Sequence, residues 1–152
     1  MRARVVHCIA AVIFATLSPS MALSDAEFDP QRYSGKIVLL DFWGSWCPAC
    51  VRTFPWMNAM LKKYEDQGLV IIAVNNDLEK EDGLAFLRDN PADFEIVWDQ
   101  EYVLARKYRV QAMPASFLLG PDGEILSNTV GFKMAQRNEY EAEIVAALAT
   151  LD

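Results

Sequence analysis

The sequence predicts a single α/β domain in which helices cover both faces of a central sheet. Two apolar runs, 37–43 and 69–74, are continuous rather than alternating, which is typical of strands buried on both faces. Predicted strands and helices follow the order β-α-β-α-β-α-β-β-α, the pattern of an α/β layer arrangement. The 152 residues are 53% hydrophobic and 23% charged, which suits one packed domain and excludes a disordered or fibrous chain.

A helix is predicted between the two apolar runs, where apolar positions recur at spacings of four and three. Gly68 is expected to end it. Pro55 lies inside the pattern and is expected to kink the helix, because proline has no backbone N–H to donate. The repeat is formed by Cys50, Phe54, Met57, Leu61 and Tyr64.

The middle of the chain predicts three shorter elements. A helix is expected over 78–90, with Leu84 and Leu87 facing inward and Pro91 following its end. A short strand over 94–98 and a short helix over 102–108 follow.

The C-terminal part predicts a hairpin followed by a helix. Strands are expected over 115–119 and 124–130, because the Gly-Pro-Asp-Gly sequence at 120–123 is a strong turn signal. The last helix is amphipathic, and its apolar face is marked by Tyr140, Ile144, Leu148 and Leu151.

Residues 1–22 have the pattern of an export signal. Two arginines precede a mostly apolar run over 5–17, and small residues fit cleavage after Ala22. The alternative is an uncleaved membrane anchor, although the 13-residue run is shorter than the ~20 residues that span a bilayer. We therefore predict a signal peptide over 1–22 and a domain over 23–152 with its core at about 36–150, located in the periplasm.

Charge and composition exclude several functions. The formal net charge is -7, and removal of 1–22 takes away two arginines and no acids, which leaves 12 basic and 21 acidic residues, a balance of -9. Such a domain is poorly suited to bind nucleic acid or an anionic membrane through a basic surface. The same removal takes away Cys8 and His7, so the remaining chain has two cysteines and no histidine.

Those two cysteines stand in the segment Trp46-Cys-Pro-Ala-Cys50, directly after the first predicted strand. We expect Cys47 at the N-terminus of the following helix, where unpaired N–H groups and the helix dipole favour the thiolate, the attacking species in disulfide exchange. Cys50 is expected one turn further along and more buried. This arrangement predicts that Cys47 attacks and that Cys50 resolves the mixed disulfide.

Three other uses of the pair compete with this prediction. A structural disulfide over so short a loop adds little stability. A zinc site needs two further ligands of the cysteine or histidine type, which the chain after residue 22 lacks. Thiolates suit Cu(I), but neither histidine nor a methionine cluster lies near the pair in sequence. A redox dithiol without cofactor or metal is therefore the main prediction.

The segment IVLLDFWGSWCPAC at 37–50 resembles the active-site strand and helix start of thioredoxin-like proteins. The segments VIIAVNND, FEIVWDQEYVLARKYRV and MPASFLLGPDGEIL, together with Gly131, resemble the exported TlpA-like and ResA-like thiol–disulfide oxidoreductases. The resemblance implies a thioredoxin fold, with a central mixed β-sheet flanked by helices on both faces in a single domain. The Thr-x-x-Cys context of peroxiredoxins is absent.

The resemblance also implies roles for four further residues. Met113 and Pro114 match the cis-proline loop, which binds an extended substrate peptide, whereas an ordinary trans proline before an edge strand is the alternative. Trp46 is expected to shield and position the dithiol. Asp41 interrupts a buried strand, where a carboxyl tends to stay neutral, and matches the buried acid of thioredoxins that helps Cys50 by general acid–base catalysis.

The alternative for Asp41 is a strand-edge acid that reaches water, and many TlpA-like proteins carry an uncharged residue at this place.

The expected function is thiol–disulfide exchange with exported proteins that carry disulfides or thiols, in the reducing direction. The family implies a membrane thiol–disulfide transporter as the electron donor. The membrane itself is a partner only if the signal segment is retained as an anchor.

Two other functions stay open at the level of sequence. One is a thioredoxin dedicated to cytochrome c maturation or to copper-site assembly. The other is a binding or chaperone module that keeps the fold without redox turnover. The pair Pro48-Ala49 between the cysteines favours a reductant or a general exchanger, because strongly oxidising relatives carry a histidine there.

Overall fold

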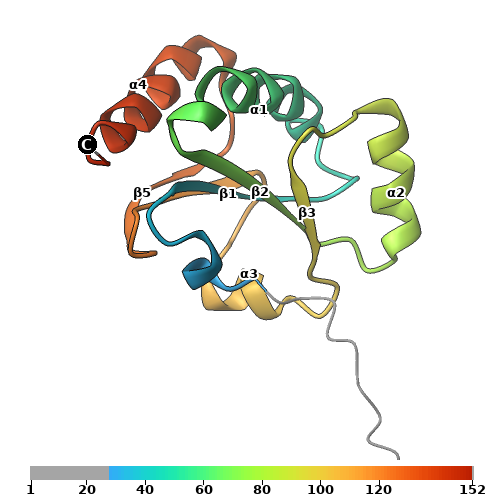
Figure 1. The fold of residues 1–152 in the computed structure, drawn as a ribbon. Coiled ribbons are helices and arrows are strands. Elements are labelled where there is room, and N and C mark those ends of the chain that lie inside the picture. Colours follow the sequence, from blue (N-terminus) through green and yellow to red (C-terminus); the bar gives the residue numbers. More distant parts are fainter. Residues whose placement is uncertain (1–27, 152) are drawn as a thin grey trace, which may run out of the picture.

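The computed structural model of the protein describes residues 28–151, which form a five-stranded mixed sheet with helices on both faces (Figure 1). The strand order is β3-β2-β1-β4-β5, so that the first strand lies at the centre. The strands are β1 (Ile37–Trp43), β2 (Leu69–Asn75), β3 (Glu95–Trp98), β4 (Ala115–Leu119) and β5 (Ile125–Val130). The predicted signal peptide, residues 1–22, lies outside the described residues.

The sheet is mixed, as predicted. β1 runs parallel to β2, and β2 runs parallel to β3. β4 is antiparallel to both of its neighbours, and the hairpin with β5 follows the predicted turn. All seven residues of β1 are buried, because strands flank it on both sides and helices cover both of its faces.

The helices divide between the two faces of the sheet (Figure 1). α1, α2 and α4 pack over the face that carries Leu39 and Trp43, whereas α3 and the short N-terminal η1 contribute to the core on the face of Leu40 and Phe42. The helical elements are η1 (Pro30–Tyr33), α1 (Cys50–Tyr64), η2 (Glu65–Gln67), α2 (Lys80–Asp89), α3 (Val103–Lys107), η3 (Met134–Gln136) and α4 (Arg137–Leu148).

Aromatic packing fixes α1 and α2 against the sheet. Phe54 is fully buried and makes edge contacts with Trp43, Phe86 and Phe94, at ring-centre distances of 4.9 Å, 5.1 Å and 5.2 Å. Such offset contacts add to the stabilisation that burial alone provides. The first turns of α1, where Cys50 lies, are therefore held rigidly.

The inward face of the second helix differs from the prediction. Leu84 is exposed, and α2 begins at Lys80 rather than at residue 78. Gly83 and Phe86 face the core instead, with Leu87 half-buried. A Cβ at Gly83 would lie 2.7 Å from the Trp98 ring, so the close approach of this helix requires glycine and turns Leu84 outward.

The other predicted elements are confirmed within one or two residues at their ends. Pro55 lies inside α1, as expected. Leu151 lies beyond α4, although it still packs against the core under that helix. Among residues 28–151, none of the helices combines the length and the apolar character needed to cross a membrane.

Candidate active site

The two cysteines lie at the carboxyl end of the central strand. Cys47 and Cys50 form a disulfide with a Cα–Cα distance of 5.4 Å. Cys50 is the first residue of α1, and Cys47 lies in the turn that leads from β1 into this helix. Cys50 therefore begins the helix, whereas we expected it one turn inside.

The Cys47 sulfur lies at the N-terminus of α1. The backbone N–H of Cys50 donates a hydrogen bond to Cys47 Sγ over 3.3 Å. In the reduced protein, such a donor and the helix dipole stabilise a thiolate on Cys47. Both side chains are buried, with 2% of Cys47 and 0% of Cys50 exposed.

Trp46 is the exposed side chain of this turn, with 60% of its surface accessible. Its indole lies over Gly44, where a Cβ would stand 2.6 Å from Trp46 Nε1. Because glycine has no side chain, it leaves room for the indole beside the cysteines. An exposed aromatic ring next to a buried disulfide offers an apolar contact to an approaching polypeptide.

A buried carboxylate anchors the same turn. Asp77 follows β2 and is 2% exposed. Both of its oxygens accept the Ser45 N–H at 3.0 Å, Oδ1 also accepts the Ser45 hydroxyl at 2.9 Å, and Oδ2 accepts Asn75 Nδ2 at 2.7 Å. Because β1 and β2 are parallel, their carboxyl ends meet, and Asp77 ties the turn that carries Cys47 to the neighbouring strand.

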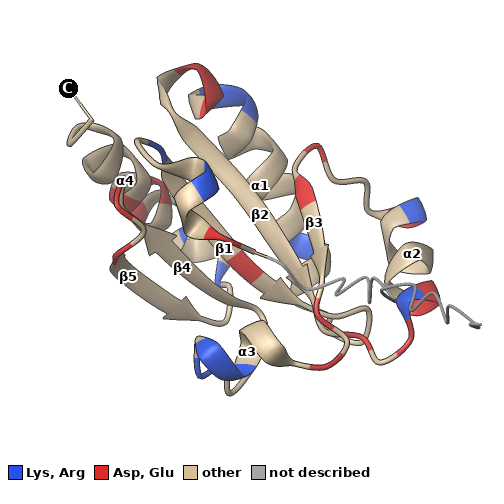
Figure 2. Ribbon diagram, turned by 60° about the horizontal axis from the view of Figure 1, so that its bottom comes forward, with Lys and Arg blue, Asp and Glu red and all other residues tan. Residues whose placement is uncertain are grey.

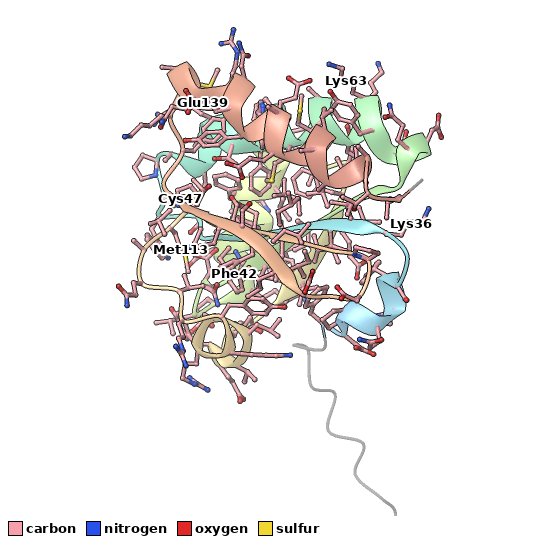
Figure 3. The ribbon with its side chains drawn as sticks, turned by 90° about the vertical axis from the view of Figure 1, so that its left-hand side faces the viewer. Lys36, Phe42, Cys47, Lys63, Met113 and Glu139 are labelled. Atoms are coloured by element: carbon pink, nitrogen blue, oxygen red, sulfur yellow. A yellow bond between two sulfur atoms is a disulfide. The ribbon has the colours of Figure 1, made fainter. Side chains whose placement is uncertain are left out.

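A second segment near the disulfide leads into β4, which flanks β1 on the side opposite β2. Met113 lies directly before β4, and the Met113–Pro114 peptide bond is cis. Met113 packs against the core cluster that contains both cysteines, while Pro114 is buried. Cys47 and Met113 lie at the same end of the molecule, away from Lys36 (Figure 3).

Asp41 lies beneath this site, fully buried in β1. Strand alternation directs it to the same face as Leu39 and Trp43, the face that α1 covers. The Ser116 hydroxyl donates to Asp41 Oδ1 over 2.6 Å, and among residues 28–151 no group bonds to Oδ2. Burial raises the pKa of Asp41 to about 7, and the hydrogen bond from Ser116 opposes that rise.

The structure thus brings Cys47, Cys50 and Met113 into one cluster and puts Asp41 on the same face of the sheet. Two polar residues, Asp77 and Ser116, hold this arrangement. The only sequence signal for the role of Asp77 is its position after a buried strand. The only signal for the role of Ser116 is the strand register, which pairs it with Asp41 across β1 and β4.

Asp99 is a third buried acid near the strand ends, and its role is structural. It is fully buried and accepts the N–H groups of Leu104 and Ala105 at 3.1 Å and 2.9 Å, so that it caps α3. In the part of the chain that the structure describes, no three His, Cys, Asp or Glu side chains are grouped so that they could hold a metal ion.

Comparison with known proteins agrees with this geometry. A model of the AhpC/TSA family matches residues 16–127. The thiol-disulfide oxidoreductase ResA of Geobacillus thermodenitrificans is 36% identical over 118 residues, which cover 76% of this chain and 68% of the relative. The ResA protein of Geobacillus kaustophilus is 35% identical over 138 residues, which cover 89% of this chain and 79% of the relative.

Solved structures show the same relationship. A putative thiol:disulfide interchange protein DsbE from Chlorobium tepidum superposes with a TM-score of 0.76 and 42% identity, covering 77% of this chain and 83% of its own. StoA from Bacillus subtilis superposes with a TM-score of 0.62 and 27% identity, covering 72% of this chain and 84% of its own. The fold of this chain is therefore thioredoxin-like, as predicted.

Asp77→Asn tests the anchor of the active-site turn. An amide in this place loses one acceptor oxygen for the Ser45 N–H, and hydrogen bonds to charged groups contribute about 1.5–3 kcal/mol. We expect the free energy of unfolding of the oxidised protein to fall by roughly 1–3 kcal/mol in a denaturant titration. The matched control is Asp122→Asn, whose carboxylate accepts a backbone N–H in an exposed turn. Equal stability of the two variants would contradict the anchor.

The buried carboxyl of Asp41 makes stability depend on pH. Its pKa is about 7 in the folded protein and about 3.9 in an unfolded chain. The folded state therefore holds the proton more tightly, and the stabilisation present below pH ~4 is lost as the pH rises through ~7. Relative to Asp41→Asn, the wild-type oxidised protein should lose roughly 2–3 kcal/mol between pH 5 and pH 8. Denaturant titrations at both pH values measure this, and parallel losses in the two proteins would refute it.

Proposed function

The chain belongs to the AhpC/TSA family and is a thiol–disulfide oxidoreductase of the ResA and DsbE type, and from this premise we propose that it reduces disulfides of exported proteins in the bacterial periplasm. The observation that supports this most directly is the Cys47–Cys50 disulfide at the N-terminus of α1. There the Cys50 N–H donates a hydrogen bond to Cys47 Sγ. A redox pair in this place can form and open without unwinding the helix.

Cys47 attacks first in the proposed reaction. Its thiolate forms a bond to one sulfur of the substrate disulfide, the substrate S–S bond breaks, and the other substrate sulfur leaves as a thiolate that takes a proton from water. Cys50 then attacks Cys47 Sγ, and the bond between Cys47 and the substrate breaks. The second substrate sulfur leaves as a thiolate that takes a proton from water, and the Cys47–Cys50 disulfide closes. The substrate gains two electrons and the protein loses two.

Asp41 serves Cys50 in the second step. The Cys50 thiol must lose its proton before it attacks, and Asp41 is the carboxyl buried on the same face of the sheet as Cys50. A pKa near 7 allows this carboxyl to accept a proton and to release it again near neutral pH. Asp41 therefore acts as the general base of resolution and as the general acid of the reverse step.

The substrate lies across Trp46 and the loop of Met113 and Pro114. The exposed indole of Trp46 gives an apolar contact on one side of the disulfide. The residue before Pro114 offers backbone groups to an extended peptide on the other side, which permits recognition of many sequences. Met113 is half-buried against the cysteine cluster, so a peptide that pairs with its backbone passes close to Cys47.

The cellular setting follows from the first residues of the sequence. Residues 1–22 direct export and are removed after Ala22, and the domain over 23–152 works in the periplasm. A reductant in that compartment needs a supply of electrons, which a membrane thiol–disulfide transporter provides. Lysine and arginine are outnumbered by aspartate and glutamate, 14 to 21, and two of them lie at the end of α3 (Figure 2). This distribution agrees with protein clients rather than nucleic acid.

Cys50→Ala tests the order of attack. Without Cys50 the mixed disulfide on Cys47 cannot be resolved, so client proteins should accumulate in covalent complexes that run as larger, thiol-sensitive species on non-reducing gels. Cys47→Ala is the matched control and should trap almost none. Trapping through Cys50 in place of Cys47 would refute the assignment. Full activity of a Cys47→Ser, Cys50→Ser double variant in cells would instead show a binding module without redox turnover.

A further inference from the structure

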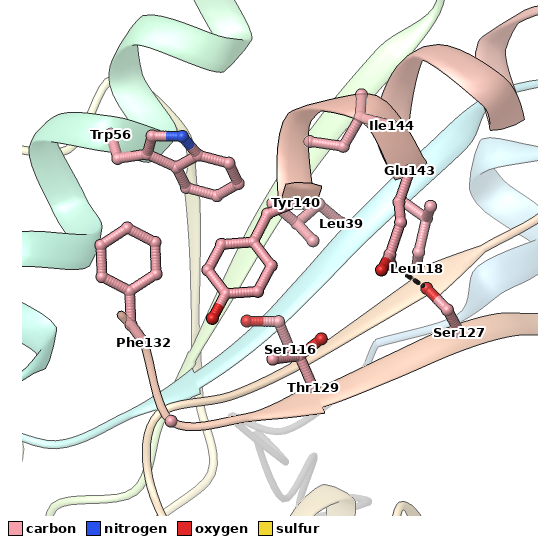
Figure 4. Close-up of a pocket in the computed structure, with 11 residues that line it drawn as sticks. Leu39, Trp56, Ser116, Leu118, Ser127, Thr129, Phe132, Tyr140, Glu143 and Ile144 are labelled. Atoms are coloured by element: carbon pink, nitrogen blue, oxygen red, sulfur yellow. Dashed lines mark hydrogen bonds between the residues drawn. The ribbon is translucent and has the colours of Figure 1, made fainter. Parts of the chain in front are cut away.

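A small cavity lies beside Ser116, the hydrogen-bond partner of Asp41. It has a volume of about 30 Å³ and lies between α1, α4 and the β4–β5 hairpin (Figure 4). Its wall combines apolar side chains such as Trp56 and Phe132 with the hydroxyl groups of Ser116, Ser127 and Thr129. A polar cavity of more than ~15 Å³ can hold an ordered water molecule.

Ser116 belongs to both the cavity and the buried acid. It lines the cavity, where it pairs in register with Thr129 of β5, and its hydroxyl donates to Asp41 Oδ1 over 2.6 Å. Ser116 is half-buried, while Asp41 is fully buried. Glu143, on the opposite wall, is exposed and accepts a hydrogen bond from Ser127 (Figure 4). Ser116 therefore connects Asp41 to a cavity whose wall also contains the exposed carboxylate of Glu143.

We propose that Ser116 is a positioning residue for Asp41 and passes the proton of this carboxyl to water in the cavity between α1, α4 and β5. This inference rests on the proposed role of Asp41 in the resolution of the mixed disulfide. It adds the route by which the proton leaves, because Asp41 is enclosed by the sheet and by α1 and has no direct contact with solvent.

The chemistry of a hydroxyl suits this role in both states of the acid. A serine hydroxyl has one donor and two acceptor sites. Toward the ionised carboxylate, Ser116 donates its hydrogen, as the structure shows. Toward the neutral acid, it accepts the carboxyl hydrogen and donates its own to cavity water. Each proton taken from the Cys50 thiol thus leaves Asp41 as a proton on water, and the carboxylate is restored.

Among the described residues, the neighbours of Asp41 in the sheet are Ala73 of β2 and Ser116 of β4, neither of which titrates. Cys50 of α1 lies over the same face of the sheet and does not titrate in the disulfide. The titratable groups Tyr140 and Glu143 of α4 line the cavity that Ser116 also lines. In the oxidised protein, the titration of Asp41 can therefore be followed without interference from the thiols.

Ser116→Ala, Ser116→Thr and Ser127→Ala test the proposal. Ser127→Ala is the matched control, because it removes a hydroxyl from the same cavity that bonds to Glu143 rather than to Asp41. The first measurement is the pH midpoint of the Asp41 carboxyl carbon in NMR spectra of the oxidised protein. We expect Ser116→Ala to raise the midpoint by about one pH unit, since a bond to the charged form is lost. Ser116→Thr should restore it, and Ser127→Ala should leave it unchanged.

The second measurement is the single-turnover rate of resolution with a synthetic disulfide-bonded peptide. If Ser116 carries the proton, Ser116→Ala should remain several-fold slower than wild type even at a pH above its own Asp41 midpoint. Full recovery of the rate there would overturn the relay and leave only an effect on the pKa. A wild-type midpoint in Ser116→Ala would overturn the positioning role as well.

Asp41→Asn separates this inference from the proposed function. A wild-type rate and pH profile in Asp41→Asn would mean that Asp41 has no part in resolution, and the relay would fall with it. A slow Asp41→Asn variant together with a wild-type rate in Ser116→Ala would leave the proposed function intact and overturn the relay alone.

Discussion

Burial of β1 on both faces is the constraint on which the site depends. A strand at the centre of a sheet must be apolar on both sides, and β1 is apolar at every position except Asp41. Because the strand is held along its whole length, its carboxyl end is fixed, and with it the turn that carries Cys47. The parallel partner β2 ends at the same edge, which places Asp77 where it can bind that turn.

Two carboxyl groups near the dithiol have opposite surroundings. Asp77 accepts hydrogen bonds from the Ser45 N–H, the Ser45 hydroxyl and Asn75 Nδ2, so its oxygens are committed to holding the turn. Asp41 has a single bond from Ser116 and an apolar strand on the other side, and burial raises its pKa to about 7. The first group therefore holds structure, and the second is able to exchange a proton. Differences of environment of this kind separate structural acids from acids that take part in chemistry.

The sequence was sufficient for the sheet and the dithiol, because continuous apolar runs and the spacing of Cys47 and Cys50 are local signals. It was less informative about features that depend on tertiary contacts. Leu84 fits the inward face of a helix by spacing, yet the close approach of Gly83 to Trp98 rotates that face away. Ser116 and Asp77 act through partners that lie 75 and 32 positions away in the chain, and no local pattern connects such pairs.

The reduction potential of the Cys47–Cys50 pair tests the central claim most directly. Equilibration of the protein with glutathione or dithiothreitol buffers measures it. A reductant of exported proteins requires a low value, near the about -270 mV of thioredoxin, because its disulfide must be the stable product of the reaction. A value near the about -120 mV of DsbA would show that the protein is an oxidant and would contradict the reducing role proposed here.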